Sequence, residues 1–220
     1  LNPKIKVIGV EPAGANCMQA SFAAGKVTTL PTVSTIADGT AVKTPGSKIF
    51  PYIRQNLDDI ITVEDDELVA AFLDMVENHK MIVENSGLLT VAALKHLDVS
   101  DKRIVSILSG GNMDVITMSS VVQQGLILRD RIFTVSVLLP DKPGELCKVS
   151  GIIAAQQGNV IKLEHNQFKN LDRFHEVELR VTVETNGEEH IDRITKALND
   201  EGYTIHRDNS NEVHEYEVTE

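Results

Sequence analysis

The chain has 220 residues, of which 42% are hydrophobic and 24% charged, and it carries a formal net charge of −11 at pH 7. This length fits one large or two small domains, and the acidic balance and the absence of Trp argue against nucleic acid and anionic membranes as partners. No apolar run is long enough to span a bilayer and no signal peptide is evident, so we expect a cytoplasmic protein.

The start of the chain has an apolar run at residues 5–10, which we expect to form an interior strand. The sequence opens at Leu1 without a methionine, and we therefore expect a fragment of a longer protein. Residues 17–24 predict a short helix that ends at Gly25. The cysteines, Cys17 and Cys147, lie far apart and have no CxxC partner, so we expect two buried thiols.

The next hundred residues alternate between loops, strands and helices. Residues 26–45 are rich in Thr, Pro and Gly, and an irregular segment of that length is usually functional. We expect a helix at 46–56, with Ile49, Tyr52 and Ile53 on one face, and a strand at 58–63. Four acidic residues, 64–67, then open a helix, where they suit the positive end of its dipole better than a metal. Further helices are expected at 88–97 and 113–128.

Residues 103–108 are apolar and largely β-branched, and they stop at Ser109-Gly110-Gly111-Asn112. This pattern predicts a buried strand that runs into a tight turn. Ligands tend to bind outside the carboxyl ends of parallel strands, and glycines let the backbone approach a flat or anionic ligand closely. Ser109 would point into such a cleft. By itself, however, the motif is equally typical of an ordinary strand-to-helix turn.

After residue 129 the hydrophobic period changes from helical to alternating. The remaining segments are predicted to be a strand at 132–139, a helix that begins after the turn at 140–146 and ends at Gly158, strands at 159–168 and 174–184, a helix at 188–201 and a strand at 203–207. This order is βαββαβ, the ferredoxin-like plan. Residues 210–220 are polar and acidic and are expected to be a solvated tail.

One ordered set of motifs carries a resemblance to a known family: Thr35-Ile36-Ala37-Asp38-Gly39, Asp58-Asp59-Ile60, Glu64-Asp65-Asp66-Glu67, Val83-Glu84-Asn85-Ser86-Gly87 and Ser109-Gly110-Gly111-Asn112. Together they resemble the second half of the pyridoxal-phosphate-dependent threonine and serine dehydratases, and residues 129–209 resemble an ACT regulatory domain. The resemblance implies an α/β chain. Its first part, 1–128, would be the C-terminal part of a three-layer fold-type II catalytic domain like the tryptophan synthase β subunit. The ACT domain, 129–209, and the tail, 210–220, would follow.

The resemblance also implies a cofactor site. Pyridoxal phosphate would serve as an electron sink for loss of the α-proton and then the β-hydroxyl of an amino acid. Ser109 would hydrogen-bond the pyridine nitrogen, and a neutral hydroxyl there favours β-elimination over transamination. Gly110, Gly111, Glu84 and Gly39 would line the same site. On the residues alone, Glu84 is equally suited to cap a helix, and Gly39 to form a surface turn.

The family's Schiff-base lysine and its tetraglycine phosphate loop have no match in this chain. We therefore expect no catalytic residue here and no activity from the chain alone. The full-length parent would be a threonine or serine ammonia-lyase, with threonine favoured and 2-oxobutanoate and ammonia as products. Some members hold a divalent cation at positions that correspond to Glu11, Ala15 and Cys17. Because a thiol is a poor ligand for a hard cation, no such metal site is expected.

For the ACT part, the resemblance implies paired domains in a homo-oligomer that bind an amino-acid effector, isoleucine or valine. The turn after the first strand would approach the ligand at Gly144, and the N–H groups of the following helix would receive a carboxylate. The candidate effector-binding residues are Asp141, Gly144, Glu145, Leu146 and Asn159. A module used only for dimerisation is the alternative.

Other interpretations remain open. His165 and His175 lie on adjacent predicted strands but have no third ligand, so we expect solvent-facing or hydrogen-bonded histidines and not a metal pair. A free-standing amino-acid sensor or dimerisation protein without catalysis is the main alternative function. A dinucleotide-binding domain is disfavoured because no GxGxxG motif follows a strand. The first part, lacking several strands, should expose apolar edges and associate or aggregate.

Overall fold

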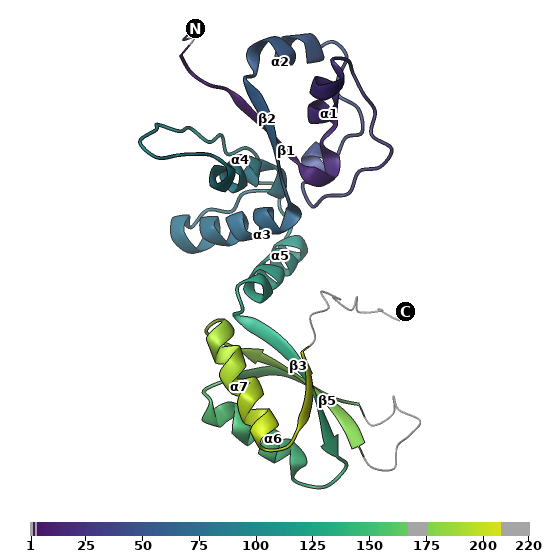
Figure 1. Ribbon diagram of the computed structural model, residues 1–220, viewed down its shortest axis with the longest axis vertical. Helices are drawn as coiled ribbons and strands as arrows, with labels where there is room; N and C mark the ends of the chain where they lie inside the picture. The colour runs from purple at the N-terminus through teal and green to yellow at the C-terminus, as the bar shows by residue number, and fades with distance from the viewer. Residues whose placement is uncertain (1, 3, 167–175, 208–220) are drawn as a thin grey trace. The chain divides into compact units, whose positions relative to one another are not determined.

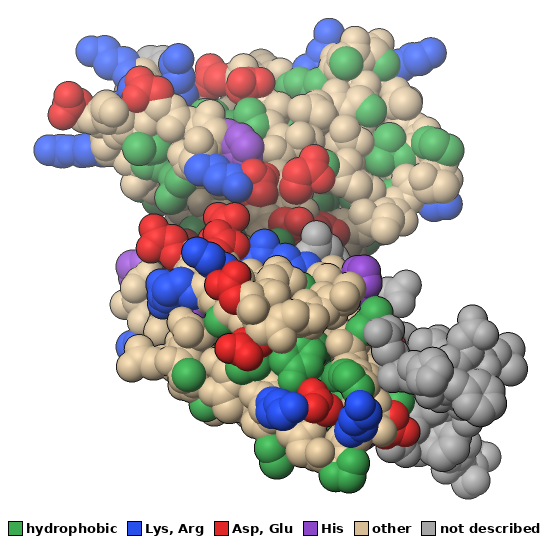
Figure 2. Space-filling model, turned by 60° about the horizontal axis from the view of Figure 1, so that its bottom comes forward, with side chains coloured by type: hydrophobic (Ala, Val, Ile, Leu, Met, Phe, Trp, Pro, Cys, Tyr) green, Lys and Arg blue, Asp and Glu red, His purple; other side chains and the backbone are tan. Residues whose placement is uncertain are grey.

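The structure is a computed structural model and describes residues 2, 4–166 and 176–207. The chain divides into two compact units, Leu1–Gly125 and Leu126–Glu220, called here the first and second units. In the described part of the chain, no helix is both long and apolar enough to cross a bilayer. On the face shown in Figure 2, acidic and basic side chains are interspersed over each unit, so the excess negative charge is not gathered into one patch there.

The first unit is built on two parallel strands, β1 (Ile8–Pro12) and β2 (Asp59–Val63) (Figure 1). Between them run helix α1 (Cys17–Ala24), a long irregular segment and helix α2 (Phe50–Asn56), as the sequence predicts. The predicted strand at 5–10 is displaced toward its carboxyl end. It is also not interior, because all but one of the residues of β1 are only half-buried.

The sequence predictions concern the end of α1 and one face of α2. Gly25 ends α1 in the left-handed region, at a φ of 68°, as predicted. The face of α2 that carries Ile49 and Tyr52 is exposed, and Phe50 is the residue of this helix that is buried. The ring of Phe50 meets that of Phe22 edge-on at 5.8 Å between centroids, an arrangement that aromatic quadrupoles favour.

The acidic run opens α3 (Asp65–Asp74), which confirms the predicted helix start. Glu64 is the N-cap of a capping box, in which its own backbone N–H donates to the Glu67 carboxylate at 2.7 Å. The predicted helix at 88–97 is broken up, since only α4 (Leu89–Ala92) is α-helical and 3₁₀ turns flank it. Helix α5 (Val115–Leu128) closes the series.

The core of the first unit lies between α3, α4 and the strands. Its members are buried aliphatic and aromatic side chains contributed mainly by these elements. They are Ala37, Val63, Leu68, Val69, Ala71, Phe72, Met75, Val83, Leu88, Leu89, Ala92, Ala93 and Val121. Four of them come from α3, so the apolar face of this helix is the centre of the unit.

The strand predicted at 103–108 is wrong. This run forms no strand, and Val105 and Ile107 are 88% and 71% exposed. The run is held by hydrogen bonds from side chains and not by the backbone hydrogen bonds of a sheet. For example, the hydroxyl of Thr90 donates to the carbonyl of Ile107 at 3.1 Å. A strand needs a neighbouring backbone to pair with, and in the described residues the first unit's sheet consists of β1 and β2 alone.

The second unit confirms the predicted βαββαβ order in full. Its elements are β3 (Ile132–Pro140), α6 (Glu145–Ala155), β4 (Asn159–Asn166), β5 (Glu176–Glu184), α7 (Glu188–Asp200) and β6 (Thr204–Arg207). The strands form one antiparallel sheet in the order β4-β5-β3-β6, and α6 and α7 pack on it (Figure 1). This is the ferredoxin-like arrangement.

Alternate positions of β3 and β5 supply the core of the second unit, as their period of two requires. The core comprises Phe133, Val135, Val137, Leu139, Val149, Ile153, Val177, Leu179, Val181, Val183, Ile191, Ile194 and Leu198. Both helices therefore contribute to the same side of the sheet. A buried histidine, His190, joins their ends, because its ring accepts the N–H of Asn186 at 3.1 Å and bonds the carbonyl of Gln156 at 2.7 Å.

The remaining sequence predictions concern single residues and the chain end. Cys17 is buried as predicted, whereas Cys147 is exposed because it lies on the solvent side of α6. His165 lies on β4 and is exposed. The prediction for His175 and the tail at 210–220 lies outside the described residues.

Candidate functional site

Two segments that are distant in sequence meet in the first unit, 84–87 and 109–112. A Cβ added to Gly87 would overlap the carbonyl oxygen of Ser109, and one added to Gly110 would overlap the carboxylate of Glu84. Gly110 also has a φ of 76°, which side chains with a Cβ rarely adopt. Glycine is thus required at both points for the segments to approach each other.

Glu84 links these two segments by hydrogen bonds. Its carboxylate accepts the backbone N–H of Asn112 at 3.2 Å, and its own N–H donates to the carbonyl of Gly110 at 3.4 Å. It makes no side-chain bond to the helical turn that follows it. The alternative that Glu84 is simply a helix cap is therefore wrong, and the carboxylate belongs to the turn that carries Ser109.

Gly39 approaches the same region from a third segment. A Cβ on Gly39 would lie 2.9 Å from the hydroxyl oxygen of Ser86. The structure thus brings together Gly39, Glu84 and the turn at 109–111, which are all of the cofactor residues expected from the sequence. Ser109 is exposed, and no atom lies within 4 Å of the Cβ position at Gly111, so this side of the turn is open.

The Gly39 segment is held in place by two polar side chains that the sequence reasoning missed. The carboxylate of Asp65 accepts the hydroxyl of Thr35 at 2.6 Å and the N–H of Ile36 at 3.0 Å. Asn85 donates its amide to the carbonyl of Ile36 at 3.0 Å. In the sequence, the acidic first turn of α3 indicated only a favourable interaction with the helix dipole. It did not indicate that Asp65 would bond to the segment that carries Gly39.

These residues suit a flat cofactor that has a ring nitrogen. The Ser109 hydroxyl is a neutral hydrogen-bonding group, while Gly110 and Gly111 leave space for a planar group beside it. In addition, the Oδ1 atom of Asn85 and the hydroxyl of Ser86 are buried and have no partner among the described residues. Buried polar atoms are normally satisfied, so a polar ligand group fits beside them.

In the segment at 11–17, the carboxylate of Glu11 makes the hydrogen bonds to the start of α1, and the thiol of Cys17 does not. Glu11 accepts the N–H groups of Met18 and Gln19 at 2.8 and 2.7 Å and so stabilises the start of α1. Burial raises the pKa of Glu11, and these bonds oppose the increase. Burial and the nearby Glu11 charge also raise the pKa of Cys17, which leaves the thiol protonated and a weak ligand.

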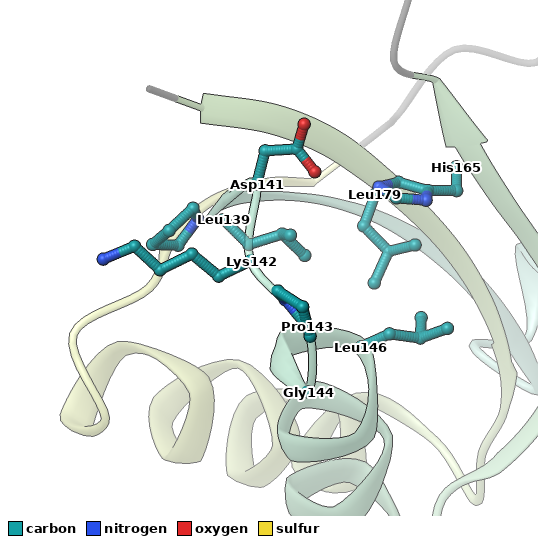
Figure 3. Close-up of a pocket in the computed structure, with 9 residues that line it drawn as sticks. Leu139, Asp141, Lys142, Pro143, Gly144, Leu146, His165 and Leu179 are labelled. Carbon is teal, nitrogen blue, oxygen red and sulfur yellow. The ribbon is translucent and has the colours of Figure 1, made fainter. Parts of the chain in front are cut away.

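The second unit contains a cavity of about 280 Å³ next to the turn between β3 and α6 (Figure 3). Its lining residues are Leu139, Pro140, Asp141, Lys142, Pro143, Gly144, Leu146, His165 and Leu179. Asp141, Gly144 and Leu146 are thus brought together, as the expected effector site requires. His165 and the leucines of the strands were not among the candidates, because only the register of the sheet places them here.

Glu145 and Asn159 are not among the lining residues of this cavity. The carboxylate of Glu145 is buried and accepts bonds from Lys148 at 2.6 Å and from the hydroxyl of Tyr203 at 2.8 Å. Lys148 first, and then Tyr203, lower the pKa of Glu145, whereas burial and Glu145 raise that of Tyr203 to about 12. Asn159 lies at the start of β4 and donates to the Glu184 carboxylate at 3.1 Å.

Residues 1–110, half of the chain, match the family model described as pyridoxal-phosphate dependent enzyme. The chain belongs to this family of pyridoxal-phosphate-dependent enzymes. Residues 133–203 match the ACT domain model, so the ferredoxin-like unit of this family member is an ACT domain. Both matches agree with the resemblance seen in the motifs.

Similar proteins extend the match over both units. The chain is 36% identical to an L-threonine ammonia-lyase of Geobacter sulfurreducens, and 32% identical to one of Thermotoga maritima. Each alignment spans 93% of this chain and 51% of the relative. The processed threonine deaminase isoform 2 of Solanum lycopersicum is 33% identical, with a TM-score of 0.51 over 56% of this chain and 37% of that one. The chain therefore spans about half the length of the curated relatives it matches.

Proposed function

We propose that this chain is part of an enzyme that converts L-threonine, and more slowly L-serine, to a 2-oxo acid and ammonia. The observation that supports this most strongly is the similarity to L-threonine ammonia-lyases along 93% of the chain, which includes every cofactor-site motif. The 2-oxo acid from threonine is 2-oxobutanoate. In this proposal, residues 1–128 belong to the catalytic domain, 129–209 form the ACT domain and 210–220 follow as a tail.

Bound pyridoxal phosphate would supply an electron sink at this site. We assign the contact with its pyridine nitrogen to the exposed hydroxyl of Ser109 and the space beside its ring to Gly110 and Gly111. Glu84 holds this turn by accepting the N–H of Asn112. Gly39 lies against Ser86 beside this turn, in the segment that Asp65 anchors. Because Ser109 is neutral, it does not hold the ring nitrogen protonated, which favours β-elimination.

The test uses the full-length gene product that contains these 220 residues. Threonine should give 2-oxobutanoate faster than serine gives its product, and Ser109→Ala should lower both the rate and the affinity for pyridoxal phosphate, the latter followed by the cofactor's absorbance. Ser100→Ala, at an exposed position outside the site, is the control and should change neither. Absence of 2-oxo acid formation, with amino-acid binding retained, would instead support a sensor without catalysis.

We also propose that the ACT unit binds an apolar amino acid, isoleucine or valine, in the 280 Å³ cavity, and that the protein is a homo-oligomer. Gly144 has a φ of 96° and lines this cavity, so Gly144→Leu strains the turn and adds a large side chain at the lining. Calorimetric titration of the 220-residue chain should therefore show saturable isoleucine or valine binding that this variant abolishes. Sedimentation of the same sample tests association.

A further inference from the structure

The cavity of the ACT unit has an apolar floor and a polar rim. Leu139 on β3 and Leu179 on β5 are almost fully buried and form part of the floor. His165 on β4 pairs directly with Leu179, which places its ring on the same face of the sheet as that leucine. In contrast to the leucines, His165 is exposed, so its imidazole lies where the cavity opens to solvent.

Three charged or ionisable side chains line this rim: Asp141, Lys142 and His165. In Figure 3 the ammonium group of Lys142 points away from His165 and from the apolar side chains, while the His165 ring lies beside Leu179. The carboxylate of Asp141 is a hydrogen-bond acceptor, so it suits an ammonium group. Of the three side chains, the His165 imidazole is therefore the donor that remains on the cavity side.

An amino acid carries one cationic and one anionic group next to its side chain, and a site that selects it has to pair both. Asp141 can accept the ammonium group, and the leucines can contact an apolar side chain. The first turn of α6 has no side-chain cap, and its own carboxylate, Glu145, is bonded to Lys148 and Tyr203. The carboxylate of the amino acid still needs a side chain that donates a hydrogen bond to it. Across the cavity from the turn that carries Asp141, strand β4 supplies His165.

We propose that His165 donates a hydrogen bond to the α-carboxylate of the effector and so makes the cavity selective for amino acids over the corresponding amines. This inference deepens the proposed effector site and rests on it. It also replaces Asn159 as the contribution of β4, because Asn159 lies at the other end of that strand, bonded to Glu184. His165 is thus a specificity residue whose position the sheet register decides.

The experiment compares two ligands that differ only in the carboxylate. Isoleucine and 2-methylbutylamine, which retains the ammonium group and the branched side chain, are titrated calorimetrically into the 220-residue chain, its His165→Ala variant and its His165→Gln variant. A hydrogen bond to a charged group corresponds to a loss of about 10-fold to 100-fold in affinity. We expect His165→Ala to weaken isoleucine by about this factor and the amine by less than about twofold, with His165→Gln in between.

His206→Ala is the matched control, since His206 is an exposed histidine on β6 that does not line the cavity. This variant should bind isoleucine as the unchanged chain does. Equal weakening of both ligands by His165→Ala, or no weakening of isoleucine, overturns the role of His165. If Gly144→Leu abolishes binding while His165→Ala does not, the effector site stands and this inference fails. If the unchanged chain binds no isoleucine, the effector site itself fails.

Discussion

The two units of the chain differ in how completely they cover their own apolar residues. In the ACT unit the inward positions of β3 and β5 are buried under α6 and α7. In the first unit, four apolar side chains are between 71% and 88% exposed: Val105 and Ile107 in the run that lacks a strand partner, and Val115 and Ile116 at the start of α5. The ACT unit therefore closes its core by itself, whereas the first unit presents an uncovered apolar edge.

This difference follows from topology. The antiparallel sheet of the ACT unit has four strands, and each of them pairs with another strand of the same unit, although the paired residues of β3 and β6 lie 66 to 72 positions apart. The first unit has one parallel pair, β1 and β2, and parallel strands are usually buried on both faces. The predictions that follow test how far the two units differ in stability and in dependence on further contacts.

The largest expected effect is in the ACT core. Ile153→Ala should lower the free energy of unfolding by about 2–5 kcal/mol because it removes a fully buried side chain. Ile107→Ala, at an exposed position of the first unit, should change it by less than about 0.5 kcal/mol. Urea unfolding followed by circular dichroism measures both. A cost at Ile107 equal to that at Ile153 would show that the exposed run is covered in solution.

Next in size is the close approach within the cofactor site. Gly87→Ala should destabilise the first unit by about 1–3 kcal/mol, because its Cβ overlaps the Ser109 carbonyl and forces the segments apart. Gly111→Ala is the matched control, with open space at its Cβ position and an expected change below about 0.5 kcal/mol. Thermal unfolding and hydrogen exchange of residues 84–112 distinguish the two. A tolerated Gly87→Ala would contradict the described contact.

A smaller effect is expected from pH on the ACT unit. Glu145 has a lowered pKa, so its contribution to stability is present above its ordinary value of 4.5 and is lost as the pH falls through the folded-state value. The raised pKa of Tyr203 adds a contribution that is lost as the pH rises from about 10 to about 12.

The variant that isolates this contribution is Glu145→Gln. It should be less stable than the unchanged chain at pH 7, and the difference should shrink as the pH falls below 4.5, as measured by thermal unfolding across pH. Glu189→Gln, at an exposed position in the first turn of α7, serves as the control. A difference between Glu145→Gln and the unchanged chain that does not shrink at all as the pH falls below 4.5 would rule out the carboxylate as its source.

The smallest effect concerns reactivity and not stability. Cys147 is exposed and should react with a thiol reagent in the native chain, whereas Cys17 is 2% exposed and its raised pKa keeps it protonated. Mass spectrometry should therefore find one fast modification, at Cys147, and a second only after unfolding. Cys147→Ser should remove the fast phase. Fast labelling of Cys17 would indicate that the first unit opens readily.

Much of the secondary structure could be predicted from local patterns. The alternation from residue 132 onward and the helical stripes of α6 and α7 predicted all six elements of the ACT unit. The stop at Gly25 and the acidic start of α3 were also predicted correctly, because a left-handed glycine and the dipole of a helix end act within one turn of helix. These signals depend on residues that are neighbours in the sequence.

The candidate sites could be predicted only in part. The motifs that contain Gly39, Glu84 and Ser109 were identified from the sequence. Their mutual contacts, and the anchoring of the Gly39 segment by Asp65, join residues more than 20 positions apart. His165 likewise lines the cavity of the ACT unit through its register opposite Leu179. The hydrophobic periodicity of a segment does not indicate which side chain from a distant segment will lie next to it.

By itself, the sequence determined the order of the elements, the motifs of a pyridoxal-phosphate-dependent enzyme with an ACT domain, and the points where glycine is needed. Only the tertiary structure decided which apolar runs are covered and which polar groups meet at each candidate site. It left residues 103–108 without strand partners. The physical reason is the distance along the chain over which each effect acts. Backbone preference and periodicity act over a few residues, whereas burial and pairing depend on parts of the chain that are distant in sequence.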